Sequence, residues 1–238
     1  MIFAAGLGTR LRPVTDTMPK ALVRVDSQPM LWHVLMKLKA AGMERIIINV
    51  HHFASQITDY LAANGCFGMD IRVSDESGKL LNTGGGIRKA RPLFCPDSPV
   101  LIHNVDILSN ADLEALYQHC EGNTLLLVSE RETKRYLLFN DDMRLCGWRN
   151  TDTGQERVQV QSPCLKQLAF SGIHLLSPDM LPLMESWPDA FGIIDFYMEQ
   201  CSTHSMKGWL QPDLRFLDIG KPDALKQAAS FRQTLGGQ

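Results

Sequence analysis

The chain has 238 residues, of which 45% are hydrophobic, and its formal net charge at pH 7 is −2. This length and composition can bury a large core and suit one sizeable α/β domain. The small net charge and the absence of a dense Lys/Arg run give no electrostatic reason to expect nucleic acid binding. No apolar stretch is long enough to cross a bilayer, so we expect no membrane-spanning segment.

The N-terminal segment and the cysteines favour a cytoplasmic protein. Residues 1–5 lack a basic region and run directly into glycines and arginines, unlike a signal peptide. The cysteines form no C-x-x-C pair, which argues against a zinc site or a redox dithiol. We expect reduced thiols at all six positions, namely Cys66, Cys95, Cys120, Cys146, Cys164 and Cys201.

The N-terminal half of the sequence alternates strand-like and helix-like patterns. Leucines and a valine at helical spacing follow Pro29, which suits a first helical turn, and the β-branched run at 45–50 is typical of a buried strand. Strands alternating with helices of this length imply right-handed crossovers and a Rossmann-like, doubly wound, mostly parallel mixed sheet. The predicted strands are 1–5, 21–25, 45–50, 70–74 and 100–103, and the predicted helices are 29–42, 54–63 and 87–94.

The C-terminal half is less regular, and no linker separates it from the first half. We therefore expect one domain over residues 1–238, with the second half extending the sheet at its edge. The predicted strands are 124–129, 136–139, 168–176, 206–210 and 215–217, and the predicted helices are 178–184, 193–201 and one that starts at Pro222.

A glycine-rich loop follows the first strand. Residues 4–13 read Ala-Ala-Gly-Leu-Gly-Thr-Arg-Leu-Arg-Pro, and Met-Pro-Lys follows at 18–20. The glycines allow backbone N–H groups to approach an anion closely, while Arg10, Arg12 and Lys20 add full positive charges. This string predicts a phosphate-binding loop.

Other phosphate-binding motifs fit less well. A P-loop would need Gly-Lys-Ser/Thr, which does not occur here. A dinucleotide-binding fingerprint would need glycine where the chain has Leu11, which disfavours an NAD-dependent oxidoreductase.

Further candidates lie at strand ends and in a second glycine run. Asp106 comes shortly after the strand at 100–103, and Asp218 comes after another short apolar segment. Taken alone, each of these aspartates is more simply explained as a turn or helix cap. Thr83 precedes three glycines and is predicted to be the N-cap of the following helix. The Phe-Ser-Gly-Ile segment at 170–173 has two interpretations, a ligand-lining strand or a core strand with a glycine for close packing.

Together these strings resemble the sugar-1-phosphate nucleotidyltransferases, or nucleotide-sugar pyrophosphorylases. Within that family the compact length and the Thr-Gly-Gly-Gly and Phe-Ser-Gly-Ile segments are most similar to the N-acetylmuramate 1-phosphate uridylyltransferases of cell-wall recycling. The resemblance runs through most of the chain, namely residues 6–20, 83–86, 104–106, 170–173 and 217–220.

The resemblance implies a fold of the nucleotide-diphospho-sugar transferase type, without the C-terminal left-handed β-helix of larger relatives. The N-terminal half would bind the nucleotide and the C-terminal half the sugar phosphate. The implied reaction transfers a nucleotidyl group from an NTP, preferably UTP, to a sugar 1-phosphate, preferably N-acetylmuramate 1-phosphate, and releases pyrophosphate. Mg²⁺ is the implied cofactor.

The resemblance also assigns roles to individual residues. Arg10 and Lys20 would be catalytic, and Asp106 and Asp218 would hold Mg²⁺, which prefers hard oxygen ligands. The implied nucleotide-binding residues are Ala5, Gly6, Gly8, Thr9, Arg10, Thr83 and Gly84, and the implied substrate-binding residues are Asn104, Ser171 and Gly172.

Several alternatives stay open at this stage. The acceptor could be heptose, mannose or glucose 1-phosphate or phosphocholine, with another base, because Asn82 and Val105 depart from the pattern of many relatives. A non-catalytic regulatory protein that binds nucleotide sugars is a second possibility. Arg12 could pair with Asp16 or take part in catalysis, the pair at 51–52 (His-His) is interpreted as polar loop residues, and the oligomeric state is open.

Overall fold

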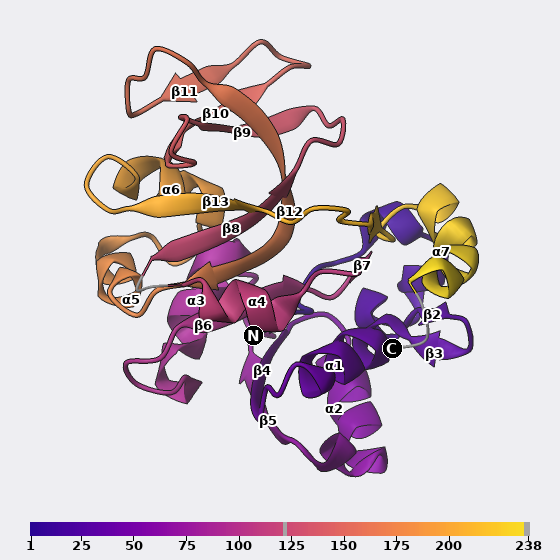
Figure 1. Cartoon of the computed structure of the whole chain (residues 1–238). Helices are drawn as coiled ribbons and strands as arrows, with labels where there is room; N and C mark the ends of the chain where they lie inside the picture. The colour runs from indigo at the N-terminus through magenta and orange to yellow at the C-terminus, as the bar shows by residue number, and fades with distance from the viewer. Residues whose placement is uncertain (121–122, 236–238) are drawn as a thin grey trace.

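The centre of the structure, a computed structural model that describes residues 1–120 and 123–235, is a ten-stranded mixed sheet (Figure 1). Strands from the first half of the chain form its parallel part: β1 pairs with β4 and β6, and β4 pairs with β5. The long strand β12 runs antiparallel to β6 and joins this part to the strands of the second half. The sheet contains β1 (Ile2–Phe3), β4 (Arg45–Val50), β5 (Asp70–Asp75), β6 (Val100–Asn104), β8 (Thr124–Ser129), β9 (Arg135–Phe139), β10 (Leu145–Asn150), β11 (Glu156–Val158), β12 (Lys166–Leu176) and β13 (Met206–Leu210).

Two short ladders lie outside this sheet. β2 (Arg24–Val25) and β3 (Gln28–Pro29) form a hairpin, while β7 (Ile107–Ser109) pairs antiparallel with β14 (Phe216–Asp218). The second ladder brings the end of the chain back to the segment that follows β6.

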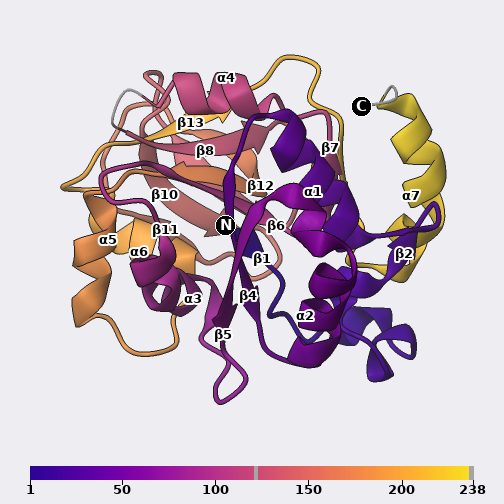
Figure 2. The ribbon, with the colours of Figure 1, turned by 90° about the horizontal axis from the view of Figure 1, so that it is seen from below.

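Helices cover both faces of the sheet (Figure 2). One apolar cluster contains residues of α1, α2, α4 and α7, and the other contains residues of α3, α5 and α6. These helices are α1 (Met30–Ala40), α2 (Ala54–Ala63), α3 (Asn82–Ala90), α4 (Leu113–Gln118), α5 (Met180–Leu183), α6 (Ile193–Gln200) and α7 (Pro222–Thr234).

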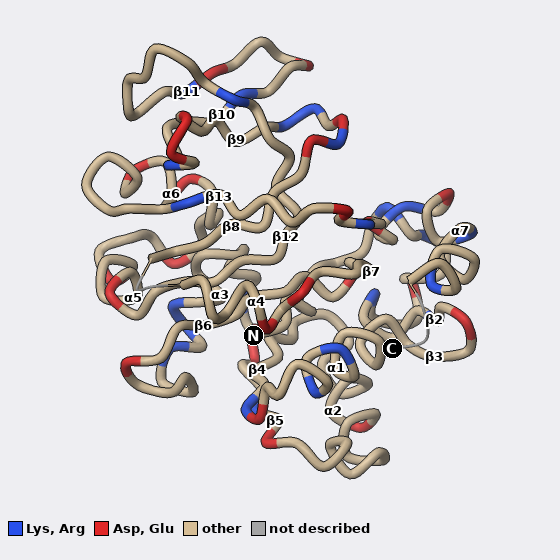
Figure 3. Tube along the Cα trace, in the orientation of Figure 1, with Lys and Arg blue, Asp and Glu red and all other residues tan. Residues whose placement is uncertain are grey.

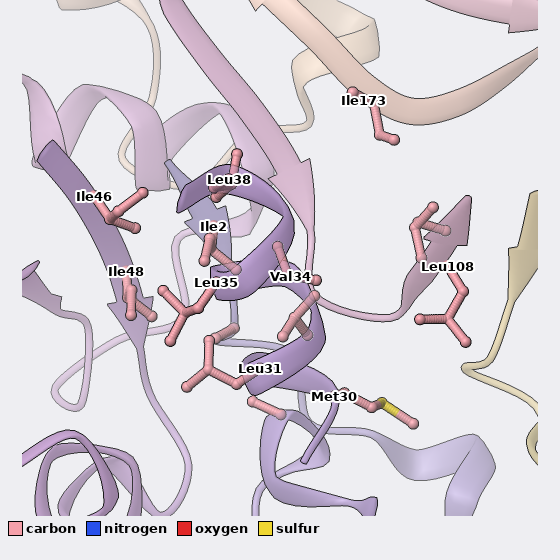
Figure 4. Packing of buried hydrophobic residues seen from close by; sticks show 14 of the residues in the cluster. Ile2, Met30, Leu31, Val34, Leu35, Leu38, Ile46, Ile48, Leu108 and Ile173 are labelled. Atoms are coloured by element: carbon pink, nitrogen blue, oxygen red, sulfur yellow. The ribbon is translucent and has the colours of Figure 1, made fainter. Parts of the chain in front are cut away.

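The pleat of β4 explains why both faces need helices. Ile46 and Ile48 belong to the cluster under α1, and Ile47 between them belongs to the opposite cluster, because successive strand side chains point to opposite faces. Figure 4 shows Leu35 and Leu38 of α1 within the first cluster. Each fully buried side chain of this size contributes about 1.5–3 kcal/mol through the hydrophobic effect.

The expected α/β class with a mixed sheet is confirmed, and the parallel pairing is concentrated in the N-terminal half. Among the residues that the structure describes, no helix is long and apolar enough to cross a bilayer.

Several predicted boundaries were wrong. The strand predicted at 21–25 is reduced to Arg24–Val25, since a 3₁₀ turn occupies Lys20–Leu22. The helix predicted at 87–94 begins earlier, at Asn82, and ends at Ala90, after which Pro92 lies in a 3₁₀ turn. The strands β10 and β11 and the helix α4 were not predicted.

Candidate active site

The glycine-rich loop after β1 folds back on itself. Gly8 adopts a left-handed backbone conformation with φ of 65°, and its carbonyl oxygen accepts a 2.9 Å hydrogen bond from the Thr15 hydroxyl. A Cβ atom at Gly8 would lie 2.9 Å from Thr15 Cγ2 and 3.1 Å from Lys20 Cβ. Glycine is therefore required at this position on both conformational and steric grounds. Because it has no side chain, the backbone at the start of the loop can lie directly against Lys20.

Lys20, Asp106 and Asp218 meet around Gly220. The Lys20 ammonium group forms an ion pair with Asp106, and both side chains are largely buried. The Gly220 N–H donates a 2.9 Å hydrogen bond to Asp218 Oδ1, and the Ile219 N–H donates to the Asp106 carbonyl at the same distance. The antiparallel pairing of β14 with β7 fixes this arrangement, with Asp218 in register with the residue that follows Asp106. Residues more than 80 positions apart in sequence thus form one cluster.

The side chains of this cluster suit a divalent cation whose other ligands are phosphate oxygens. A Cβ atom at Gly220 would lie 2.5 Å from Asp106 Oδ2 and 2.9 Å from both Asp218 Oδ1 and Lys20 Nζ, so only glycine leaves this space free. Carboxylate oxygens are the hard ligands that Mg²⁺ prefers, and it usually takes one or two of them together with phosphates and water. No group of three or more His, Cys, Asp or Glu side chains suited to a metal occurs among the described residues.

The two arginines of the loop differ in their surroundings. Arg12 forms a 3.2 Å ion pair with Asp16 four residues further along the chain, as one of the two interpretations of Arg12 expected, and its part in catalysis stays untested. Arg10 lies in the same loop and is exposed to solvent, so its guanidinium group is accessible to an anionic ligand. Its catalytic role, like that of Lys20, stays a prediction.

The remaining loop residues that we predicted to bind nucleotide lie at the end of β1. Ala5 is buried, Gly6 is exposed, a Cβ atom there would meet nothing within 4 Å, and Thr9 begins a 3₁₀ turn. Their backbone N–H groups lie in the loop that carries Arg10, and their contact with a nucleotide stays a prediction.

A buried polar network that the sequence analysis missed braces the carboxyl ends of the first strands. Asn49 on β4 accepts a 2.8 Å hydrogen bond from the Ala4 N–H and donates one of equal length to Glu76 Oε1. Glu76, fully buried after β5, also accepts from the Leu81 N–H at 3.3 Å just before α3. Burial raises the pKa of Glu76, and the hydrogen bond from Asn49 opposes that shift. The sequence signal was weak: Asn49 lies near the end of the strand predicted at 45–50, and Glu76 lies two residues after the strand predicted at 70–74.

The histidine pair lies beside this network without forming a metal site. His51 Nδ1 is 2.6 Å from the Glu76 carbonyl oxygen, and the ring of His52 packs on Phe53 with centroids 3.9 Å apart. The two side chains therefore have different partners, as expected for adjacent residues after a strand.

The predicted N-cap at Thr83 was wrong in one respect. Thr83 lies inside α3, and its hydroxyl accepts a 2.9 Å hydrogen bond from the N–H of Ile193, so it caps α6 instead of its own helix. The reason is tertiary packing: a Cβ atom at Gly84 would collide with the Phe191 ring, and the N–H of Gly84 donates to the Phe191 carbonyl at 2.9 Å. The glycines thus allow α3 to approach residues 189–193, and nucleotide binding by Thr83 and Gly84 stays a prediction.

The three predicted substrate-binding residues lie on the adjacent strands β6 and β12. Gly172 has a φ of 76°, and a Cβ atom there would collide with the Asn104 side chain. The Ser171 hydroxyl is buried and accepts a 3.2 Å hydrogen bond from the N–H of Ile173, so its present partners belong to its own strand. Asn104 is half-buried two residues before Asp106, which brings this pair of strands next to the carboxylates.

Comparison with known proteins agrees with this geometry. The sequence model of the family described as "Nucleotidyl transferase" matches residues 1–144, which is more than half of the chain and includes the loop, Lys20 and Asp106. The chain belongs to the nucleotidyl transferase family. This nucleotidyl transferase is 31% identical to the N-acetylmuramate alpha-1-phosphate uridylyltransferase of Caulobacter vibrioides, over 98% of this chain and 95% of that protein. It is also 43% identical to the protein of the same name from Neisseria meningitidis serogroup B, over 50% of this chain and 51% of that one.

Solved structures share the fold of this nucleotidyl transferase. A putative glucose-1-phosphate thymidylyltransferase from Bacillus anthracis superposes with a TM-score of 0.82 at 16% identity, covering 100% of this chain and 96% of that one. HddC from Yersinia pseudotuberculosis, solved with GMP-PN, gives a TM-score of 0.76 at 23% identity with 96% of each chain covered. The family and its named relatives identify the chain as a sugar-1-phosphate nucleotidyltransferase.

Proposed function

We propose that the enzyme transfers the uridylyl group of UTP to N-acetylmuramate 1-phosphate, forming UDP-N-acetylmuramate and pyrophosphate in the cytoplasm during cell-wall recycling. The choice of substrates is supported by the relative that carries this activity in its name and matches nearly the whole chain. The observation that carries the reaction type is the convergence of Lys20, Asp106 and Asp218 around Gly220.

The proposed reaction is an in-line displacement at the α-phosphorus of UTP. A phosphate oxygen of the sugar phosphate attacks, the bond between the α-phosphorus and the bridging oxygen breaks, and pyrophosphate leaves with the bond electrons. The attacking oxygen is already an anion, so no general base is required. The catalytic difficulty is to bring two highly negative molecules together, which makes positioning and charge stabilisation the main contributions.

Each side chain of the cluster has a part in that task. Asp106 and Asp218 would hold Mg²⁺, which when bound neutralises phosphate charge and orients the triphosphate. Lys20, beside Asp106, would hold phosphate oxygens, and Arg10 would reach the triphosphate from the exposed loop with its forked donors. Residues 5–9 would cradle the nucleotide through backbone N–H groups and the Thr9 hydroxyl.

The test is pyrophosphate release in the presence of Mg²⁺, with each of the four common NTPs against a panel of sugar 1-phosphates that includes N-acetylmuramate 1-phosphate. We expect release to be highest for UTP with that sugar. The variants Asp106→Asn and Arg10→Ala should remain folded by circular dichroism and lose about 10²-fold or more in kcat, because each removes a group that stabilises the transferring phosphoryl charge. Asp142→Asn, at an exposed turn distant in sequence from the cluster, is the matched control and should keep full activity.

The possible outcomes separate the rival functions. Release with another NTP or with heptose, mannose or glucose 1-phosphate would retain the reaction and replace the substrates. Near-normal rates in both variants would exclude the assigned roles of Asp106 and Arg10. A folded wild-type protein that binds nucleotide sugar but releases no pyrophosphate with any pair would favour the regulatory alternative.

A further inference from the structure

A hollow lies among the strands of the second half of the chain. It has a volume of about 510 Å³ and lies between the strands β9 and β10 and the start of α6. Figure 3 shows basic segments in the strands and loops of this part of the molecule. The hollow combines three guanidinium groups with three aromatic rings, those of Arg131, Arg135, Arg157, Tyr136, Trp148 and Phe170.

Arg131 connects this hollow to the cluster of carboxylates. Its guanidinium group lies 4.6 Å from the ring centroid of Phe216, and Nη2 donates a 2.8 Å hydrogen bond to the Phe170 carbonyl. Phe216 is on β14, two residues before Asp218. Phe170 is on β12, two residues before Gly172, which packs against the Asn104 side chain. Burial lowers the pKa of Arg131, and the nearby charge of Asp218 opposes that shift. Arg131 therefore lines the hollow and also contacts the strand that carries Asp218.

The hollow has an excess of positive charge. Arg157 forms a 2.9 Å ion pair with Asp195 and stacks over Trp148 at 5.0 Å. Among the described residues, Asp195 is the one acidic side chain that lines the hollow. Within residues 1–120 and 123–235, neither Arg131 nor Arg135 forms an ion pair with a carboxylate. Two arginine charges are thus left for a ligand.

Two donors in the hollow also lack partners. The Nε–H groups of Arg131 and Arg157 are buried and have no hydrogen-bond acceptor in the structure. A buried donor without an acceptor costs about 1–3 kcal/mol, so both guanidinium groups are held in place by the packing around them and not by their own hydrogen bonds at Nε. The apolar faces of Trp148 and Tyr136 beside these donors suit a sugar ring.

We propose that this hollow recognises a carboxylate carried by the acceptor sugar, with Arg135 as a direct contact. The proposal rests on the proposed function, since N-acetylmuramate 1-phosphate differs from N-acetylglucosamine 1-phosphate by a lactyl ether that ends in a carboxylate. Arginine binds such a group with two parallel hydrogen bonds. A neutral sugar would leave these arginines desolvated without a counter-charge, so the hollow selects for acidic acceptors.

The test compares acceptors in wild type and an Arg135→Gln variant. Arg135 is exposed at the start of β9, so its replacement should not affect folding. We expect kcat/KM for N-acetylmuramate 1-phosphate to fall about 10- to 100-fold, mainly through KM, because the variant loses the charge-assisted contact of Arg135 with the carboxylate. For N-acetylglucosamine 1-phosphate the change should be less than about twofold, because that sugar has no carboxylate to lose.

Arg149→Gln is the matched control. Arg149 lies on the neighbouring strand β10, is paired with Glu156, and does not line the hollow. It should leave the ratio between the two acceptors unchanged. Arg135→Lys should recover part of the preference, because an ammonium group keeps the charge but not the forked geometry.

The acceptor panel also contains glucuronate 1-phosphate, which separates failure of this inference from failure of the proposed function. A wild-type preference for glucuronate over N-acetylmuramate would support carboxylate recognition and overturn the proposed substrate. Use of N-acetylmuramate 1-phosphate with the same preference in Arg135→Gln would overturn the role of Arg135 and retain the proposed function. A wild-type preference for a neutral sugar would overturn both.

Discussion

At the scale of single residues, two histidines are held in the core without charge. His103 and His174 are fully buried, and burial lowers the pKa of each to about 3. His103 Nδ1 lies 2.7 Å from the carbonyl oxygen of Asn104, whereas neither ring nitrogen of His174 has a hydrogen-bond partner in the structure. Both act as neutral packing groups in the strands β6 and β12.

This burial predicts loss of stability in mild acid. The unfolded chain binds a proton at each of these histidines near pH 6.5 and the folded chain only near pH 3, so stability falls as the pH decreases below about 6.5. Each histidine should remove about 2 kcal/mol of unfolding free energy between pH 7.5 and pH 5, measured by urea denaturation. His174→Phe, next to the rings of Phe170 and Tyr197, should remove its share of that loss. Exposed His119→Gln is the control and should keep the full loss, and an unchanged pH dependence in His174→Phe would contradict the argument.

At the scale of helices and strands, local sequence patterns predicted the elements whose structure depends mainly on their own residues. The run at 45–50 was predicted as a buried strand because β-branched residues fill both faces, and it is buried at five of six positions. The edge strand β11 and its neighbour β10 carry polar and charged residues and were missed. The residues of the loop at 6–20 were enough to predict phosphate binding. The proximity of Asp218 to Asp106 could not be predicted from the local sequence, and only the family resemblance assigned both residues to one metal site.

The link between α3 and α6 is an element-scale contact with a measurable contribution. Thr83 and Ile193 are 110 residues apart, and the hydroxyl of Thr83 satisfies the first N–H of α6. Replacing Thr83 by Val keeps the shape of the side chain and leaves that N–H unsatisfied, so unfolding free energy should fall by about 1–2 kcal/mol in urea denaturation. Thr83→Ser should restore most of it. The control is Thr58→Val on α2, because the Thr58 hydroxyl donates only to the Ser55 carbonyl of its own helix. An equal loss there would refute a specific capping role.

At the scale of the whole molecule, the candidate active site is formed where the two ends of the fold meet. The loop after β1 supplies Lys20, the connection between β6 and β7 supplies Asp106, and β14 returns from the C-terminal half with Asp218. These charges are brought together at Gly220 at an electrostatic cost that bound phosphate and cation would offset. A ligand at this point therefore ties distant parts of the chain together and should stabilise the whole fold.

The prediction is that UTP with Mg²⁺ raises the unfolding free energy, by about 2.7 kcal/mol at a free concentration 100 times its Kd, measured by thermal or urea denaturation. Gly220→Ala should abolish this increase, because the new Cβ would lie 2.5 Å from Asp106 Oδ2 and 2.9 Å from Lys20 Nζ, in the space that ligand oxygens would use. The atoms it meets are the ends of side chains that can shift, so the stability without ligand should change by less than about 1 kcal/mol. Gly78→Ala, whose Cβ would meet nothing within 4 Å, is the matched control and should retain the full ligand effect. A Gly220→Ala variant that UTP and Mg²⁺ stabilise as much as wild type would mean that the nucleotide and cation bind elsewhere.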